Sequence, residues 1–154
     1  MSLRLSLLLS LVIVFLLSPT AFADSDAALL LRLKGTYFGR EVATLRAPGF
    51  KTERSQFSTR YVLPNGRGVI RGYHRAIGGT GRARLVGRIR RVKCRGNRVI
   101  YQGVVRFRFR GRSLTARRFR AVATERANAT AILTTTGTYK LRGIRINGAF
   151  RGQK

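Results

Sequence analysis

Arginine alternates with apolar residues along much of this chain, and the alternation limits what the chain can fold into. Residues 98–110 read RVIYQGVVRFRFR and residues 82–90 read RARLVGRIR. Because successive side chains of a β-strand point to opposite faces, both runs predict strands with one apolar and one basic face. The turn residues at 95–97 (RGN) lie between the runs, so the two strands are predicted to form a β-hairpin.

Similar alternation elsewhere predicts an all-β fold. Further strands are expected near 31–34, 57–61, 69–76, 113–124, 128–137 and 139–146, with Asn147 and Gly148 in a last turn. About eight strands with turns at roughly 10–15-residue intervals are typical of barrels and sandwiches. Glycines inside the strand patterns, among them Gly87 and Gly103, indicate close backbone approach in a strongly curved sheet. We therefore predict a small antiparallel barrel of about eight strands, with a two-sheet β-sandwich as the alternative.

The N-terminal segment is predicted to be a cleaved signal peptide. Arg4 precedes an apolar run over residues 7–17, and residues 21–23 (AFA) have the small-x-small form that signal peptidase accepts. The run is shorter than the roughly 20 residues that cross a bilayer. We therefore expect a signal peptide over 1–23 and a single β domain over 24–154, with residues 24–30 either a short helix or disordered. The mature chain is expected to be secreted or periplasmic, with no transmembrane segment.

The charge balance predicts which face of the sheet is buried. The 154 residues include 32 Lys+Arg and 5 Asp+Glu, a formal net charge of +27 at pH 7, and from Arg54 onward Glu125 is the only acidic residue. In an outer-membrane barrel the polar side chains face the lumen. These arginines would then be buried there without partners, at a cost of several kcal/mol per ion. We therefore expect a soluble barrel with phenylalanine inside and arginine outside.

The predicted outer face is the candidate binding site. Neighbouring strands lie about 4.8 Å apart, so the hairpin would carry a lattice of guanidinium groups whose mutual repulsion a polyanion would relieve. Arginine supplies 27 of the 32 basic residues, and it binds phosphate, sulfate and carboxylate in bidentate fashion. The alternative is a basic surface that serves solubility only. The candidate polyanion-binding residues are Arg82, Arg84, Arg88, Arg90, Arg106, Arg108, Arg110, Arg118 and Arg120.

Export favours polyanions found outside the cytoplasm. These are acidic polysaccharide, lipopolysaccharide phosphate, anionic lipid headgroups or an anionic membrane surface, and extracellular nucleic acid. Nucleic acid is not favoured, because no aromatic residue is predicted on the basic face between Arg82 and Arg110 for bases to stack on. Tyr73 and Phe38 are exceptions on their own strands, and scattered exposed aromatic residues are ordinary.

Two further functions remain open. The barrel could bind an apolar ligand in an interior cavity lined by residues such as Tyr101, Val105 and Phe107. It could also be a structural envelope component whose arginines serve only as surface. A deep dry cavity would support the first alternative, and a filled core would count against it.

The sequence predicts neither catalysis nor a cofactor nor a metal site. The only histidine, His74, has no partner motif and is interpreted as structural; with Cys94 it makes too few ligands for zinc. Residues 78–82 (GGTGR) lack the GK[ST] ending of a phosphate-binding loop. Cys94 lies between Lys93 and Arg95, which should favour its thiolate, and a disulfide-linked dimer through Cys94 is a further hypothesis.

Overall fold

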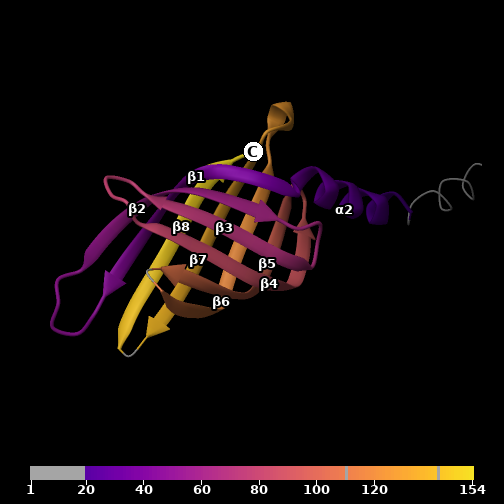
Figure 1. Ribbon diagram of the computed structural model, residues 1–154. Coiled ribbons are helices and arrows are strands. Elements are labelled where there is room, and N and C mark those ends of the chain that lie inside the picture. Colours follow the sequence, from indigo (N-terminus) through magenta and orange to yellow (C-terminus); the bar gives the residue numbers. More distant parts are fainter. Residues whose placement is uncertain (1–19, 110, 142) are drawn as a thin grey trace, which may run out of the picture.

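A computed structural model shows a closed antiparallel barrel of eight strands, with a helix at one end (Figure 1). It describes residues 20–109, 111–141 and 143–154, without the side chains of residues 20–25, 109, 112, 129 and 141. Each strand pairs with its neighbours in sequence, and β1 pairs with β8 to close the barrel. The elements are α2 (Thr20–Leu33), β1 (Gly35–Arg46), β2 (Glu53–Leu63), β3 (Gly68–Ala76), β4 (Arg82–Arg95), β5 (Arg98–Phe109), β6 (Arg112–Glu125), a 3₁₀ turn (Ala127–Ala129), β7 (Ala131–Leu141) and β8 (Ile144–Gln153). The predicted eight-stranded barrel is confirmed, and the predicted hairpin is β4–β5. The strand expected near 31–34 is wrong, because α2 extends to Leu33 and the first strand is β1. The strand expected over 139–146 is divided between β7 and β8.

The period-two pattern places apolar side chains inside and arginines outside. Along β2 and β4, buried and exposed residues alternate. Tyr61 and Leu85 are fully buried, whereas Arg60 and Arg84 in the adjacent positions are exposed. A barrel has no free sheet edge, so each strand residue has only these two environments. The predicted orientation is therefore the observed one.

The interior is packed at the residues where the alternative function would place an apolar ligand. Tyr101 and Val105 are fully buried and Phe107 is 9% exposed. The ring centroid of Phe107 lies 5.6 Å from that of Tyr139 and 5.4 Å from that of His74. These side chains fill the space that the ligand would occupy, which counts against interior binding.

Two β-bulges turn consecutive arginines outward. The β4–β5 register shifts just before Arg91, and Arg90 and Arg91 are both exposed. The β5–β6 register shifts at Arg117 and Arg118, which are likewise both exposed. Strict alternation would have placed one arginine of each pair in the core. A bulge inserts one extra residue and bends the strand, so it keeps both outside and adds curvature.

Two glycines allow β4 and β5 to approach each other closely. A Cβ atom on Gly103 would overlap the backbone carbonyl of Arg88, and one on Gly87 would overlap Val105. The close approach predicted at Gly87 and Gly103 is therefore confirmed.

The predicted last turn at Asn147 and Gly148 is wrong, because both residues lie inside β8. The chain reverses around Gly143, whose φ of +80° favours glycine. Thr138 Oγ1 of β7 donates a hydrogen bond to Asn147 Oδ1 at 3.0 Å, and Gly148 leaves room for the buried carboxylate of Glu41. Both residues thus have strand partners that an Asn-Gly dipeptide does not reveal.

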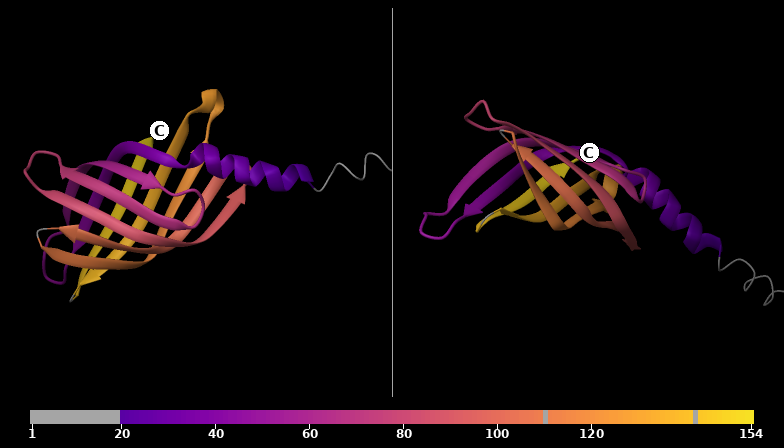
Figure 2. Two further views of the ribbon diagram at one scale, coloured as in Figure 1. Left: turned by 45° about the vertical axis from the view of Figure 1, so that its right-hand side comes forward. Right: turned by 60° about the horizontal axis from the view of Figure 1, so that its bottom comes forward.

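The C-terminal half of α2 packs against one end of the barrel (Figures 1 and 2). Leu29 and Leu33 are buried in the core cluster, and the Tyr37 hydroxyl donates to the carbonyl oxygen of Leu33 at 2.6 Å. Arg32 Nε lies 2.6 Å from Glu125 Oε1, an ion pair that lowers the pKa of the Glu125 carboxyl. Residues 24–30 are therefore helical rather than disordered. The predicted signal peptide lies mostly outside the described residues, and its cleavage stays a prediction.

If α2 is an integral part of the fold, Leu33→Ala should lower the free energy of unfolding of the mature chain by about 2–4 kcal/mol, because the side chain is fully buried. Leu31→Ala is the matched control, since Leu31 is 53% exposed on the same helix, and its effect should stay within about 0.5 kcal/mol. Urea unfolding followed by circular dichroism measures both. Equal effects would contradict the docking of α2.

Candidate functional site

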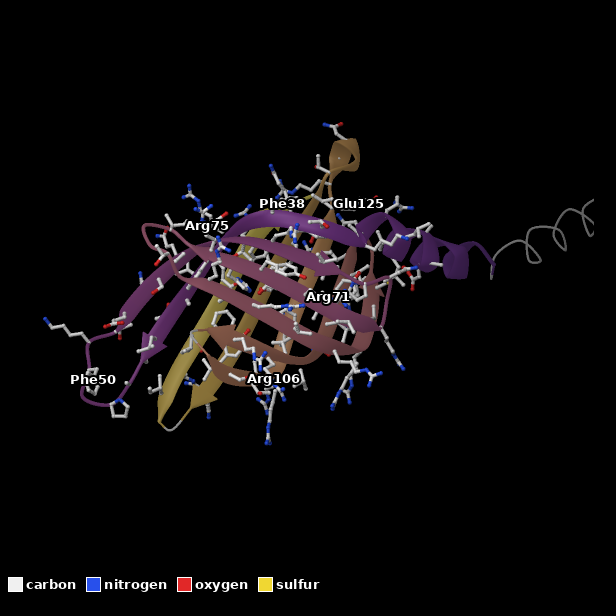
Figure 3. All side chains as sticks on the ribbon, in the orientation of Figure 1. Phe38, Phe50, Arg71, Arg75, Arg106 and Glu125 are labelled. Carbon is white, nitrogen blue, oxygen red and sulfur yellow. The ribbon has the colours of Figure 1, made fainter. Side chains whose placement is uncertain are left out.

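The predicted polyanion-binding arginines lie on three neighbouring strands, since β5 pairs with both β4 and β6. Their outward side chains share one surface, termed the arginine face. Figure 3 shows Arg106 of this face projecting away from the barrel. The face consists of Arg82, Arg84, Arg88 and Arg90 of β4, Arg106 and Arg108 of β5, and Arg118 and Arg120 of β6, all exposed. The remaining predicted residue, Arg110, lies outside the described residues.

The strand register brings like charges into direct opposition. Arg84 pairs with Arg108 across β4–β5, and Arg82 pairs with Arg75 across β3–β4. Directly opposite residues of antiparallel strands have Cα atoms roughly 4.5–5.5 Å apart. Within the described part of the chain, the carboxylate contacts with basic side chains are Arg32 with Glu125 and His74 with Glu41, and neither lies on the arginine face. The face is therefore not neutralised by those carboxylates.

Basic side chains are unevenly distributed around the barrel. Two outward arginines lie on β1 and two on β8: Arg40, Arg46, Arg145 and Arg151. The outward residues of β7 are Ile132, Thr134, Thr136, Thr138 and Lys140, whereas β4 carries Arg82, Arg84, Arg88, Arg90, Arg91, Lys93 and Arg95. The charge is thus densest over β4 to β6, and the arginine face is a patch on a basic protein.

The register also joins two aromatic side chains to this patch. Directly opposite residues form a row from β1 to β5, in the order Phe38, Arg60, Tyr73, Arg84, Arg108. The Cζ atom of Arg60 lies 4.7 Å from the Tyr73 ring centroid and that of Arg84 lies 5.6 Å from it. We term this the aromatic–arginine row. The interpretation of Tyr73 and Phe38 as ordinary scattered aromatic residues overlooked strand pairing, which the sequence does not show and which brings them beside the predicted site.

The aromatic–arginine row lines a groove of about 960 Å³ on the barrel surface. Its lining residues are Phe38, Ser58, Thr59, Arg60, Tyr73, His74, Arg75, Arg82, Ala83, Arg84, Arg108 and Gly111. None of these is acidic, and five are arginines. The groove therefore combines dense positive charge with aromatic surface.

His74 has an acidic partner that sequence separation concealed. Its Nδ1 lies 3.1 Å from Glu41 Oε2 and 3.1 Å from Thr59 Oγ1, and the Tyr61 hydroxyl donates to Glu41 Oε2 at 3.0 Å. Burial, reinforced by the Glu41 carboxylate, raises the pKa of Tyr61 well above its usual value, so Tyr61 remains a donor. The His74 side chain has no solvent exposure, and a general base must reach the proton that it removes. This burial supports a structural role for His74.

The remaining candidate chemistry is limited. Among the described residues, no three His, Cys, Asp or Glu side chains come together as metal ligands. Half-buried Cys94 packs against the core cluster, as does Leu30 of α2. Burial raises the pKa of Cys94, so the expected stabilisation of its thiolate by Lys93 and Arg95 is wrong. The disulfide-linked dimer stays a prediction.

Comparison with known proteins shows a resemblance of fold. No protein-family model matches the chain, and no curated protein matches it. The solved structure of Ail, the attachment invasion locus protein of Yersinia pestis, is similar with 15% sequence identity and a TM-score of 0.46, covering 78% of this chain and 97% of Ail. A structure of Ail in complex with the heparin analogue sucrose octasulfate is similar with 13% identity and a TM-score of 0.46, covering 78% of this chain and 95% of Ail.

The predicted location is corrected by this comparison. The prediction of a free secreted or periplasmic protein finds no support in Ail, which is an outer-membrane β-barrel protein, and at a TM-score of 0.46 the likeness is one of fold alone. A signal peptide directs export but does not distinguish among the compartments and membranes beyond the cytoplasm. Among the described residues, no helix is long and apolar enough to cross a membrane.

Like-charge repulsion at the arginine face should be measurable. Arg108→Thr should raise the free energy of unfolding by about 0.2–1 kcal/mol at low salt, because it removes the cation opposite Arg84. The gain should vanish at about 1 M salt, where the Debye length is about 3 Å. The matched control is Arg106→Thr on the same strand and face, since Arg106 lies opposite Val86 and Thr115. Equal gains at the two positions in thermal unfolding would show that opposition is unimportant.

The buried Glu41–His74 pair should be essential for stability. Glu41→Ala should lower the free energy of unfolding by about 1–3 kcal/mol, because the buried Tyr61 hydroxyl and His74 lose a hydrogen-bond partner. Glu53→Ala is the control at an exposed glutamate, with an expected effect within about 0.5 kcal/mol. Chemical denaturation at neutral pH compares the two variants, and a mild effect of Glu41→Ala would contradict the structural role of the pair.

Proposed function

We propose that this protein is a non-catalytic barrel of the bacterial envelope that binds a polyanion at the outer membrane through its arginine face. The observation that carries the proposal is the density of exposed, unneutralised arginines over β4 to β6, among which Arg84 and Arg108 are directly opposite. Such a patch is unfavourable alone, and an anion placed between two guanidinium groups removes the repulsion and gains charge-assisted hydrogen bonds.

The binding is electrostatic in origin and should depend on salt. A polyanion carries condensed counterions, which are released when arginines replace them. Each guanidinium can also bind a phosphate, sulfate or carboxylate through two parallel hydrogen bonds, which lysine cannot do. The density of arginine over β4 to β6 favours a ligand with many anionic groups over a singly charged one.

The outward arginines also favour one mode of association with the membrane. An arginine facing lipid at the bilayer midplane costs about 2–4 kcal/mol, and this cost falls near the interface. The arginine face is therefore suited to the headgroup region, where lipopolysaccharide phosphates and anionic lipid headgroups lie. We propose that the barrel binds at that surface.

Retention of the mature protein on heparin and phosphorylated matrices in a salt gradient tests the proposal. The wild type should bind in a salt-dependent manner, and Arg84→Ser combined with Arg108→Ser should elute at lower salt. Loss of two anion contacts should reduce the slope of log K against log salt by about 1–2. The matched control combines Arg40→Ser with Arg151→Ser, because these residues are also directly opposite, across β1–β8, and carry the same charge.

The control variant should elute close to the wild type. Absence of salt-dependent retention would refute polyanion binding. Equal losses in the two double variants would mean that the arginines act as a uniform surface, as expected of a structural envelope component. Vesicles with anionic or zwitterionic headgroups extend the test to membranes, and only the anionic vesicles should bind the wild type.

A further inference from the structure

The groove lined by the aromatic–arginine row shows more organisation than dispersed surface charge. We propose that it is a specific subsite for a saccharide bearing closely spaced phosphate or sulfate groups, in which Tyr73 positions Arg60 and Arg84 for the ligand. The inference rests on the proposed polyanion binding and adds its ligand class and a positioning residue.

Tyr73 holds two guanidinium groups near one ring. Arg60 of β2 and Arg84 of β4 lie directly opposite Tyr73 on either side of β3. Their Cζ atoms lie 4.7 Å and 5.6 Å from the ring centroid, so they are at most about 10 Å from each other. The attraction of a cation to an aromatic ring restricts both arginines before any ligand arrives. Less conformational freedom is then lost on binding, and preorganisation of this kind raises affinity.

The rest of the groove adds positive charge without a neutralising group. Arg75 and Arg82 lie directly opposite each other across β3–β4, and Arg108 lies opposite Arg84. All three line the groove, and none of the lining residues is acidic. A ligand that neutralises five arginines within about 960 Å³ must carry several anionic groups close together.

The groove contains five arginines and one aromatic ring that is open to a ligand, which favours a saccharide over a single-stranded nucleic acid. Single-strand sites stack successive bases on aromatic side chains. Here both guanidinium groups contact the Tyr73 ring, which leaves Phe38, at 60% exposure, as the ring open to a ligand in this groove. Five arginines beside one open ring fit a sugar that carries more than one phosphate or sulfate. Phe38 then supplies apolar surface for the C–H face of that sugar.

The size of the groove is consistent with several sugar units. Ligand sites commonly occupy roughly 300–1,000 Å³, and this groove is near the upper limit. The same chemistry occurs in free anionic polysaccharide and in phosphorylated glycolipid headgroups. Two probes represent these sources: a heparin-derived hexasaccharide, and diphosphorylated lipid A in phosphatidylcholine vesicles.

The decisive variant removes the ring and leaves the net charge unchanged. Tyr73→Ala should weaken hexasaccharide binding by about fivefold in calorimetric titration at physiological salt, since two cation–π contacts are lost. Tyr73→Phe keeps the ring and should bind within about twofold of the wild type. Phe50→Ala is the matched control, because Phe50 is 78% exposed in the β1–β2 turn, away from the groove (Figure 3), and it should also bind like the wild type.

A double-mutant cycle tests whether Tyr73 acts through Arg60. Arg60→Gln should weaken binding in the wild type and weaken it less in the Tyr73→Ala background, because the contact is already lost. Arg67→Gln, the same change at an exposed arginine in the β2–β3 turn, should show no such coupling. If Tyr73→Ala does not fold, Tyr73→Leu tests the same contact with an apolar side chain that lacks a ring.

The outcomes separate this inference from the proposed function. If the wild type binds neither probe nor the heparin matrix, polyanion binding itself is refuted. If the wild type binds but Tyr73→Ala binds equally well, the positioning role is wrong while polyanion binding stands. An oligothymidylate of equal charge that binds more tightly than the hexasaccharide would overturn the saccharide assignment. An effect of Tyr73→Ala on both probes would support access to glycolipid headgroups, and an effect on the hexasaccharide alone would support free saccharide.

Discussion

The excess of guanidinium groups over carboxylates governs this structure, because a closed barrel offers a strand residue only an inside and an outside. Of the few acidic residues, Glu41 is buried against His74 and Glu125 pairs with Arg32 of α2. Glu41 therefore acts in the core, and Glu125 acts at the barrel end where α2 packs. The arginines lie outside, and two β-bulges place even consecutive arginines there, so these two carboxylates do not neutralise the arginine face.

The alternation of arginine with apolar residues made the barrel, the β4–β5 hairpin and the exposed arginine face predictable. These features depend on residues near one another in sequence, where period two and turn composition are informative. The aromatic–arginine row was not predictable, because it requires the register of four successive strand pairs. Register depends on turn geometry and bulges, and a shift of one residue would have turned Tyr73 inward. The Glu41–His74 pair was hidden for the same reason, since the two residues lie on β1 and β3.

At two places in the chain the local composition predicted the wrong environment. Asn147 and Gly148 resemble a turn, but a hydrogen bond from Thr138 and the buried carboxylate of Glu41 explain them within β8. Lys93 and Arg95 suggested an activated thiol, yet burial, reinforced by the Asp26 carboxylate, raises the pKa of Cys94. In both cases the immediate sequence neighbours indicated one environment, and residues from paired or packed elements supplied another.

Repulsion between neighbouring arginines is partly offset in one half of the aromatic–arginine row and not in the other. Between Arg60 and Arg84 the Tyr73 ring is interposed, so its π-face offsets part of the repulsion in the unliganded protein. Arg84 and Arg108 are directly opposite, and among the described residues no aromatic ring is found between them, so their repulsion is not offset in this way. A ligand that relieves this repulsion stabilises the folded state by mass action. If the arginine face binds a polyanion as proposed, stability and polyanion affinity are coupled through Arg84, which belongs to both halves of the row.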